Sequence, residues 1–447
     1  MEMRSCILMV AMSLLLPVAA TAGTGVTLKE AVEMALGRNH LVKAAGYDQQ
    51  ASAGAASASR SRYLPRVFLE ENAAVTNSAT RVFMMKLDEG RFTDSDFQTS
   101  TLNHPGTRGD FQTRFFLEQP LLDFSIGLGV EMADREDEGR RLVLARRREE
   151  VALRTAAAWF EVQKGRGRRD AAEKAVQDAG EHLRLSVVRS GTGVGLKSDE
   201  LRARTFLADM EQQAVTAAND LLLARLRLAQ VTGGDTGEAL DAAAGGEALP
   251  PLPGKRDLVR LALENRPDLK EMEQQAGRAD VAVRLARSAY LPTVYGTASY
   301  QMNDRDIPFG RDNDSWYAGA ALRWELFDGL RRGKELESAR ARSQSAAETL
   351  EEYRRLLALE VTESWLRREE AEKRLALALS ACASAEEAVR LIGRRYENSL
   401  ATMADLLDAQ TALNRARAQA IENECEVALA TARVYHAAGV LTKEVMK

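Results

Sequence analysis

Two segments of the chain alternate between apolar and polar residues with a period of two. In FQTRFFLEQP one side carries Phe111, Thr113, Phe115 and Leu117. In WYAGAALRWEL it carries Trp316, Ala318, Ala320, Leu322 and Trp324. One apolar face at this period is typical of outer-membrane strands, and a half-buried soluble hairpin is the alternative interpretation. Together with the stretches after two Tyr-Leu-Pro elements, the predicted strands cover about residues 66–75, 111–119, 293–301 and 316–325.

Two tryptophans share the predicted apolar face of the last strand. Trp316 and Trp324 lie eight residues apart. Aromatic residues gather at both edges of the hydrocarbon band in membrane strands. Allowing for strand tilt, we expect the two tryptophans near these edges, as a candidate membrane girdle in contact with outer-membrane lipid.

Two other tracts have helical composition and no proline. Proline is absent between Leu121 and Leu249 and again between Phe309 and Lys447, where Ala, Leu, Arg and Glu dominate. From Ser125 to about Arg189 a continuous helix would hold roughly 65 residues and reach on the order of 95 Å. Because this exceeds the diameter of a globular domain, the sequence predicts a long rod or tunnel.

Apolar residues also recur every seven positions near the C-terminus. The repeat consists of Leu406, Leu413, Ala420, Val427, Val434 and Leu441, with Ala409, Ala416, Asn423, Ala430 and Ala437 three positions further on. This spacing with small residues is typical of a coiled coil with closely packed helices, and a helical bundle core would use the same pattern. In either case we expect the stripe to be buried against neighbouring helices.

The chain repeats itself once. The Tyr-Leu-Pro elements at Tyr63 and Tyr290 correspond, and so do the tryptophans at Trp159 and Trp365. Each copy reads helix, strand, loop, strand, long helix, turn, long helix, and a Gly- and Pro-containing linker separates them. The predicted units are a first repeat at 23–232, a linker at 233–254 and a second repeat at 255–447.

The N-terminus and the composition limit the possible functions. Residues 1–22 have a basic start, an apolar run and a small-residue cleavage site, which predicts a secretory signal peptide. The net charge of −4 gives no footprint for nucleic acid, and the four His and three Cys are not grouped at metal-ligand spacing. No cluster of catalytic residues stands out, so we expect neither an enzyme nor a bound cofactor.

The segment RSGTGVGLKSDEL joins two predicted long helices. Its glycines suggest a phosphate-binding loop, but such a loop needs Gly directly before Lys, and Leu196 precedes Lys197 here. The preceding sequence is also helical in composition. The segment therefore predicts a tight turn at the end of a helical hairpin.

Four strands per chain cannot close a sheet in lipid, because open edges would leave backbone groups without hydrogen bonds. Several chains must therefore contribute strands to one structure. The duplicated pattern, the paired Tyr-Leu-Pro elements and the stretch RYENSLATMADLLDAQTAL at Arg395 resemble the TolC-type outer-membrane efflux proteins over the whole mature chain. The resemblance implies a mainly α fold with a β part, in which a homotrimer forms a twelve-stranded β-barrel continued by a periplasmic α-helical barrel.

The resemblance also implies function and partners. It implies a passive outer-membrane exit channel for efflux or type I secretion that works with an inner-membrane pump of the RND or ABC type and a periplasmic adaptor (membrane fusion) protein. The alternative is a periplasmic coiled-coil adaptor or scaffold, which would carry one hairpin flanked by β domains. The sequence identifies neither the exported substrate nor the pump.

By the same resemblance, two helical tips become candidate adaptor-docking sites. Their residues are Gly193, Val194, Gly195 and Leu196 in the first copy, and Ser399, Leu400, Ala401 and Thr402 in the second. Ser399 stands where the family usually has Gly, and Ala401 stands where its best-known member carries a gate-locking Arg. The resemblance thus leaves open whether Tyr396, which is retained, takes part in a Tyr–Arg lock.

Two acidic residues follow the second tip. Asp405 and Asp408 are three positions apart, so a helix places both on one face. They match the acids that ring the periplasmic entrance in the family, and with Tyr396 they form a candidate gate ring. Crowded like charges would raise some of their pKa values and attract cations. The alternative is that both simply favour a helix N-terminus.

The loop between the first two strands is much longer than the loop between the last two. It runs over residues 76–110. Membrane strands of this type carry their longer loops on the outside. We expect this loop at the extracellular mouth, where it either narrows the opening or is an ordinary surface insertion.

Overall fold

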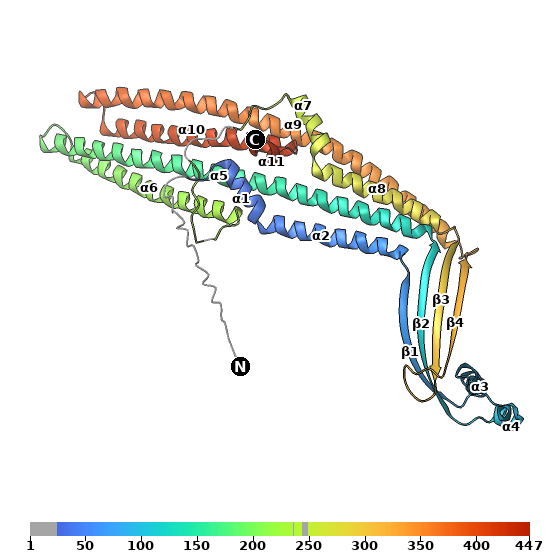
Figure 1. Ribbon diagram of the computed structural model, residues 1–447. Coiled ribbons are helices and arrows are strands. Elements are labelled where there is room, and N and C mark those ends of the chain that lie inside the picture. Colours follow the sequence, from blue (N-terminus) through green and yellow to red (C-terminus); the bar gives the residue numbers. More distant parts are fainter. Residues whose placement is uncertain (1–24, 236, 244–248) are drawn as a thin grey trace, which may run out of the picture.

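The computed structural model describes residues 25–235, 237–243 and 249–447. The predicted signal peptide at 1–22 lies outside the described residues, as do residues 236 and 244–248 of the predicted linker. Figure 1 shows a long bundle of helices that ends in a four-stranded sheet, with short helices beyond the far end of the strands. The strands turn away from the helix axis, so the helical part and the strand part follow one another along the molecule.

The same order of elements occurs in both halves of the chain. The first half contains α1 (Leu28–Arg38), α2 (His40–Arg60), η1 (Ser61–Tyr63), β1 (Arg66–Thr76), β2 (Arg108–Leu122), α5 (Phe124–Gly191) and α6 (Lys197–Val231). The second half contains α7 (Lys255–Asn265), α8 (Pro267–Ser288), β3 (Thr293–Asp304), β4 (Asn313–Arg323), α9 (Arg331–Glu397), α10 (Met403–Ala437) and α11 (Leu441–Val445). The predicted fold class, with duplicated long helices and four strands, is confirmed.

The strands form one antiparallel sheet in the order β1-β2-β3-β4. Because β2 pairs with β3, the strands of the two halves join edge to edge. One row across the sheet consists of Leu69, Phe115, Tyr300 and Trp316. We call the side that carries this row the apolar face. Val67, Leu117, Ala318 and Leu322 lie on the same side, because each is an even number of residues from the member of the row in its own strand. The opposite side, the polar face, carries Asn72, Gln112, Arg114, Ser299 and Gln301.

The last strand ends earlier than the sequence predicts. β4 stops at Arg323, which pairs with Thr293, the first residue of β3. The residue before Thr293 is Pro292, which has no N–H to extend the ladder. Trp324 therefore follows the strand instead of lying within it, and its indole N–H donates a hydrogen bond to the Tyr290 carbonyl oxygen at 3.1 Å.

The long helices are as continuous as the absence of proline predicts. α5 has 68 residues and α9 has 67, and at 1.5 Å per residue each is about 100 Å long. α5 forms a hairpin with α6, α9 forms a hairpin with α10, and α10 also packs against α5. No helix in the described part of the chain is both long enough and apolar enough to cross a membrane.

The largest apolar core lies where the short and long helices of both halves meet. Trp159 is fully buried there and packs edge-on against Phe160, with ring centroids 5.2 Å apart. Its indole N–H donates a hydrogen bond to the Val26 carbonyl oxygen at 2.9 Å, so this buried donor is satisfied. Trp365, the counterpart in the second half, packs against the same core.

The seven-residue stripe is buried along most of α10, but it does not continue to Leu441 within one helix. α10 ends at Ala437, and Gly439 has a φ of +70°. A glycine in this conformation after the last helical residue is a common helix terminator. Leu441 is buried as the first residue of the separate helix α11.

The long connection between β1 and β2 is folded. Residues 77–107, here called the cap, contain α3 (Ala79–Asp88), η2 (Asp94–Phe97) and α4 (Thr99–Asn103). Phe92 lies edge-on to both Phe83 and Phe97, with centroids 4.8 and 5.0 Å away, and Val82 is buried beside them. Figure 1 places α3 and α4 beyond the ends of the strands that point away from the helices.

Candidate functional site

The first helical tip is a tight glycine turn. Gly193 has a φ of +75°, and the N–H groups of Val194 and Gly195 both donate to the Arg189 carbonyl oxygen. A Cβ at residue 195 would lie 3.1 Å from backbone atoms of Arg189 and Ser190. Gly193 adopts the left-handed conformation without strain and Gly195 leaves room for the close backbone approach, so both glycines favour the turn itself, a structural role independent of docking.

The second tip builds the same kind of turn without glycine. Ser399 takes the left-handed conformation with a φ of +61°, and the Leu400 N–H donates to the Arg395 carbonyl oxygen at 2.7 Å. Thr402 then caps α10. The replacement of the usual Gly by Ser thus keeps the turn, at the strain expected for a non-glycine residue at positive φ.

One arginine joins the two tips within a single chain. The guanidinium of Arg189, at the end of α5, lies over the ring of Tyr396 at 4.8 Å from its centroid. It also donates to the Glu397 carbonyl oxygen at 3.0 Å and to Ser399 Oγ at 2.8 Å. Burial is the largest cause of the raised pKa of Tyr396, whose side chain packs with Ala401 in a small apolar cluster.

Arg189 is not among the residues predicted from the sequence. The family resemblance places an arginine at the position of Ala401, in the same hairpin as Tyr396. The partner comes instead from the other hairpin. The available signal was a basic residue in the last turn of the helix before the first tip, together with a tyrosine just before the second tip.

The two candidate gate acids are exposed and lie on the first turns of α10, but they differ in their contacts. One carboxylate oxygen of Asp405 accepts hydrogen bonds from the backbone N–H of Thr402 at 2.8 Å and from its hydroxyl at 2.7 Å. The Asp405 N–H donates back to the Thr402 hydroxyl, which completes a capping box. These hydrogen bonds lower the pKa of Asp405. In the single chain, Asp405 thus has the helix-start role named as the alternative.

Apolar side chains at the two tips face solvent. Val194, Leu196 and Leu400 are each about two-thirds exposed. They belong to two tips that Arg189 joins through its hydrogen bonds to the Glu397 carbonyl oxygen and to Ser399 Oγ. Exposed apolar residues grouped at one end of a long rod are a typical feature of a protein contact surface.

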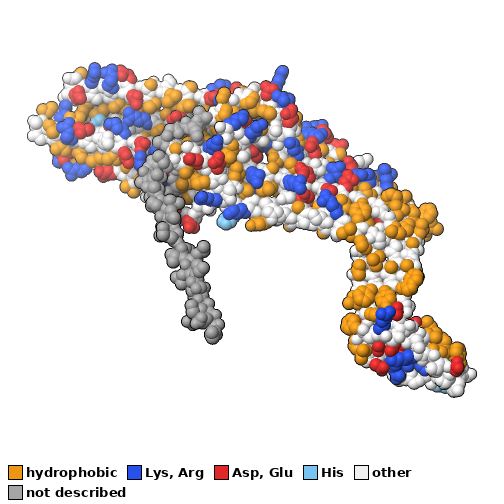
Figure 2. All heavy atoms as spheres, viewed as in Figure 1, with side chains coloured by type: hydrophobic (Ala, Val, Ile, Leu, Met, Phe, Trp, Pro, Cys, Tyr) orange, Lys and Arg blue, Asp and Glu red, His pale blue; other side chains and the backbone are white. Residues whose placement is uncertain are grey.

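The apolar face of the sheet is exposed as well. Trp316 is 79% exposed, and Val67, Leu69 and Leu322 are more than half exposed. Figure 2 shows hydrophobic side chains gathered where the strands meet the helices and again near the outer ends of the strands, while charged side chains are spread over the helical part. Trp316 lies towards the outer end of this face and Trp324 at its helical end.

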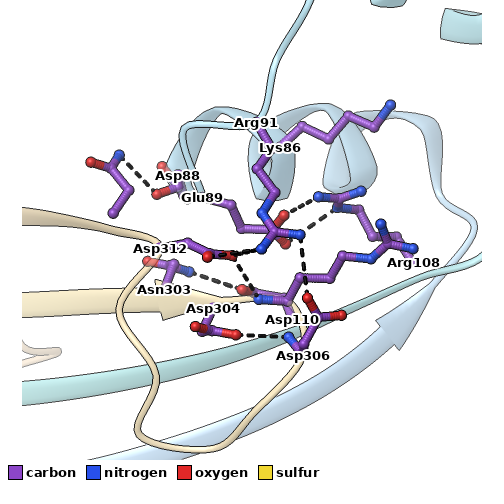
Figure 3. A network of polar contacts seen from close by, with 12 residues as sticks. Lys86, Asp88, Glu89, Arg91, Arg108, Asp110, Asn303, Asp304, Asp306 and Asp312 are labelled. Carbon is purple, nitrogen blue, oxygen red and sulfur yellow. Dashed lines mark hydrogen bonds and ion pairs between the residues drawn. The ribbon is translucent and has the colours of Figure 1, made fainter.

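A polar network joins the cap to the outer ends of the strands (Figure 3). Arg91 donates to Asp312 at 2.8 Å and to Asp306 at 3.3 Å, both in the turn between β3 and β4. The hydrogen bond from Arg91 is the main cause of the lowered pKa of Asp312.

Further contacts lie on the polar face of the strands. Arg108 forms a buried ion pair with Glu89, and Asn303 donates a hydrogen bond to Asp110 at 3.0 Å. The cap therefore covers the outer end of the polar face.

Comparison with known proteins assigns the chain to a family. The model of the outer membrane efflux protein family matches residues 31–234 and 258–440, which include most of both halves. The chain belongs to this family. Its membership confirms the predicted outer-membrane location and a role in transport instead of catalysis, and it leaves the adaptor or scaffold alternative without support.

Two curated relatives are similar over part of their length. Protein CyaE of Bordetella pertussis is 28% identical over 185 residues, which cover 41% of this chain and 39% of CyaE. Outer membrane protein OprJ of Pseudomonas aeruginosa is 30% identical over 181 residues, which cover 37% of this chain and 36% of OprJ. The matched part thus spans well under half of either relative.

The fold is similar over most of the chain to that of a solved outer membrane channel. The structure of CmeC from Campylobacter jejuni superposes with a TM-score of 0.78, covering 92% of this chain and 85% of CmeC at 16% sequence identity. At this identity the likeness shows a shared fold, which agrees with the family match.

Proposed function

We propose that three copies of this chain form one outer-membrane exit channel, a passive conduit for efflux or type I secretion. The observation that carries the proposal is the sheet with two open edges. β1 and β4 each pair with one neighbour only among the described residues, while the apolar face is widely exposed. Three such sheets, joined β4 to β1, give twelve strands with every edge paired, as a lipid environment requires.

The helical part would then continue the conduit on the periplasmic side. Two hairpins per chain would supply six hairpins around a threefold axis. Each hairpin extends beyond the central core by about half the length of α5. The charged residues spread along these helices suit a water-filled lumen and an aqueous exterior. The cap lies at the strand ends away from the helices, and strands of this type carry their longer loops on the extracellular side, so the helices would extend on the periplasmic side.

The tips are the proposed site of adaptor docking and gating. Val194, Leu196 and Leu400 offer apolar contact area for the helical hairpins of a periplasmic adaptor, which links the channel to an inner-membrane pump. Asp405 and Asp408 of three chains would place six carboxylates around the entrance. Tyr396, held by Arg189, would keep the second hairpin against the first when the entrance is closed.

Membrane fractionation with reconstitution tests the proposal. The protein should stay with the outer membrane after a high-salt wash, dissolve in detergent and give discrete ion-conducting steps in a planar bilayer. Release by salt alone, or purified protein that never conducts, would refute a membrane channel. Crosslinking from a cysteine placed at Val194 in whole cells should capture an adaptor, whereas capture from the distant cap residue Thr99 should not occur.

A further inference from the structure

The turn between β3 and β4 carries an apolar tip that faces solvent. Half of residues 305–312 are charged, yet Ile307 is 59% exposed and Phe309 is 63% exposed, with Pro308 between them. Two large apolar side chains exposed close together on one turn form a small patch that is suited to contact with an apolar partner. The cap does not cover them, since its contacts with this turn run through Arg91 to Asp306 and Asp312.

The tip folds over the apolar face of the sheet. The Phe309 N–H donates a hydrogen bond to Glu71 Oε1 at 3.3 Å, and Glu71 Oε2 accepts from the Thr113 hydroxyl at 2.5 Å. Glu71 pairs with Thr113, two residues along from the pair of Leu69 with Phe115. The side chains of all four residues therefore point to the same side of the sheet. The turn thus satisfies the one carboxylate that interrupts the apolar face of β1.

The backbone holds this arrangement against strain. Phe309 has a φ of +56°, a conformation that costs a bulky residue roughly 1–2 kcal/mol. One carboxylate oxygen of Asp304 accepts from the N–H groups of Asp306 and Ile307 at 2.8 and 3.1 Å, which fixes the start of the turn. These hydrogen bonds and the one to Glu71 hold the turn in a conformation in which the Phe309 ring is exposed.

The tip continues the aromatic row of the apolar face. Tyr300 and Trp316 pair in the same row as Leu69, which is two residues from Glu71 towards the helical end of β1. Trp316 is 79% exposed. The guanidinium of Arg311 lies 6.0 Å from the centroid of the Tyr300 ring, so a cation stands beside the aromatic residues at the outer end of the strands. Aromatic and basic side chains together are typical of the boundary between acyl chains and headgroups.

We propose that the β3–β4 turn is a membrane anchor that inserts Ile307 and Phe309 into the outer leaflet at the boundary between headgroups and acyl chains. The proposal rests on the proposed membrane position of the sheet and adds a surface outside the strands to it. The anchor also fixes the cap, because Arg91 binds Asp306 and Asp312 on either side of the apolar tip (Figure 3). The cap is thereby held at a set height above the membrane.

Spin-label accessibility tests the anchor. Cys6, Cys382 and Cys425 are replaced by alanine, and single nitroxides are attached to Phe309→Cys, Ile307→Cys, Ala318→Cys and Phe97→Cys in the full chain. The protein is reconstituted into vesicles of phosphatidylethanolamine and phosphatidylglycerol. Oxygen, which concentrates in lipid, is compared with a nickel chelate, which stays in water. Phe97 is the matched control, because it is an equally exposed phenylalanine (65%) on the cap.

The anchor predicts that the ratio of oxygen to nickel accessibility is several-fold higher at residues 307 and 309 than at residue 97, and approaches that at residue 318 on the apolar face. A nickel-accessible label at 309, with a lipid-exposed label at 318, would overturn the anchor and leave the proposed channel intact. A nickel-accessible label at 318 would refute the membrane position of the sheet, and the anchor with it.

Discussion

Arg189 illustrates how single residues at the tips combine contacts from distant parts of the chain. Tyr396 could be nominated from the sequence because its motif is local. Arg189 could be noted only as a basic residue near the first tip, because its contact with Tyr396 depends on how two long helices are rotated against each other. A place at the helix N-terminus is the alternative role that the sequence suggests for Asp405, and in the structure its carboxylate forms a capping box with Thr402 at the start of α10. Asp408 stays a candidate gate residue.

Removing the arginine contact should loosen the tip. Arg189→Ala loses one cation–π contact and two hydrogen bonds, together about 1–3 kcal/mol. We expect roughly tenfold more frequent opening in planar-bilayer recordings. The control is Arg184→Ala, which removes an exposed arginine of the same helix paired with Glu181. Equal opening frequencies in both variants would show that Arg189 does not restrain the entrance.

The two acids should separate selectivity from helix capping. Asp408→Ala should weaken cation selectivity and the block by multivalent cations while leaving thermal stability unchanged. Asp405→Ala should reduce both selectivity and the apparent midpoint of thermal unfolding, because it also removes the capping box. Reversal potentials in a salt gradient and circular dichroism measure the two effects. If the double variant has wild-type selectivity, the acids serve only the helix start.

The stabilisation that the Thr402–Asp405 capping box gives to α10 should also change with pH in a defined direction. The pKa of Asp405 is lower in the folded chain than in an unfolded one, because Thr402 donates hydrogen bonds to the carboxylate. Its stabilising contribution is therefore present above the unfolded value of about 4 and is lost as the pH falls through the lower folded value. The difference in unfolding midpoint between wild type and Asp405→Ala should be constant near neutral pH and shrink below about pH 4. A difference that grows on acidification would contradict this assignment.

At the scale of elements, periodic patterns were sufficient for the strands and the long helices, because period two and the absence of proline are local signals. The cap was expected only as a long loop. Its short helices α3 and α4 depend on packing among Phe83, Phe92 and Phe97. No periodic pattern in the local sequence predicts this packing. The end of β4 was also misplaced, since the strand stops where its partner β3 begins after Pro292. Pairing with a neighbour, and not composition, set that boundary.

Deleting part of the cap should change conduction without disrupting assembly. The deletion from Arg81 to Asp96 removes Arg91 and most of α3, which cover the outer end of the polar face. We expect a larger single-channel conductance and an unchanged mass in detergent, because no strand of the sheet is lost. Arg91→Ala should give a smaller increase, since it only releases the cap from Asp306 and Asp312. Wild-type conductance in the deletion variant would show that the cap does not narrow the mouth.

At the scale of the whole molecule, the exposed apolar face and the two unpaired strand edges describe a chain that is incomplete alone. The internal repeat explains why one polypeptide supplies two similar hairpins, and the family match fixes the outer membrane as their setting. The number of chains follows from strand counting and the family resemblance, since a single chain contains no contact between copies. The assembly is therefore the central claim that most needs a direct measurement.

Native mass spectrometry of the detergent-extracted protein is that measurement. Three chains, joined β4 to β1 into one closed sheet, predict a single dominant species of three times the mature chain mass that persists as detergent is stripped in the gas phase. A dominant monomer or dimer at concentrations that conduct in planar bilayers would contradict the account, because four or eight strands with open edges would then be the working form.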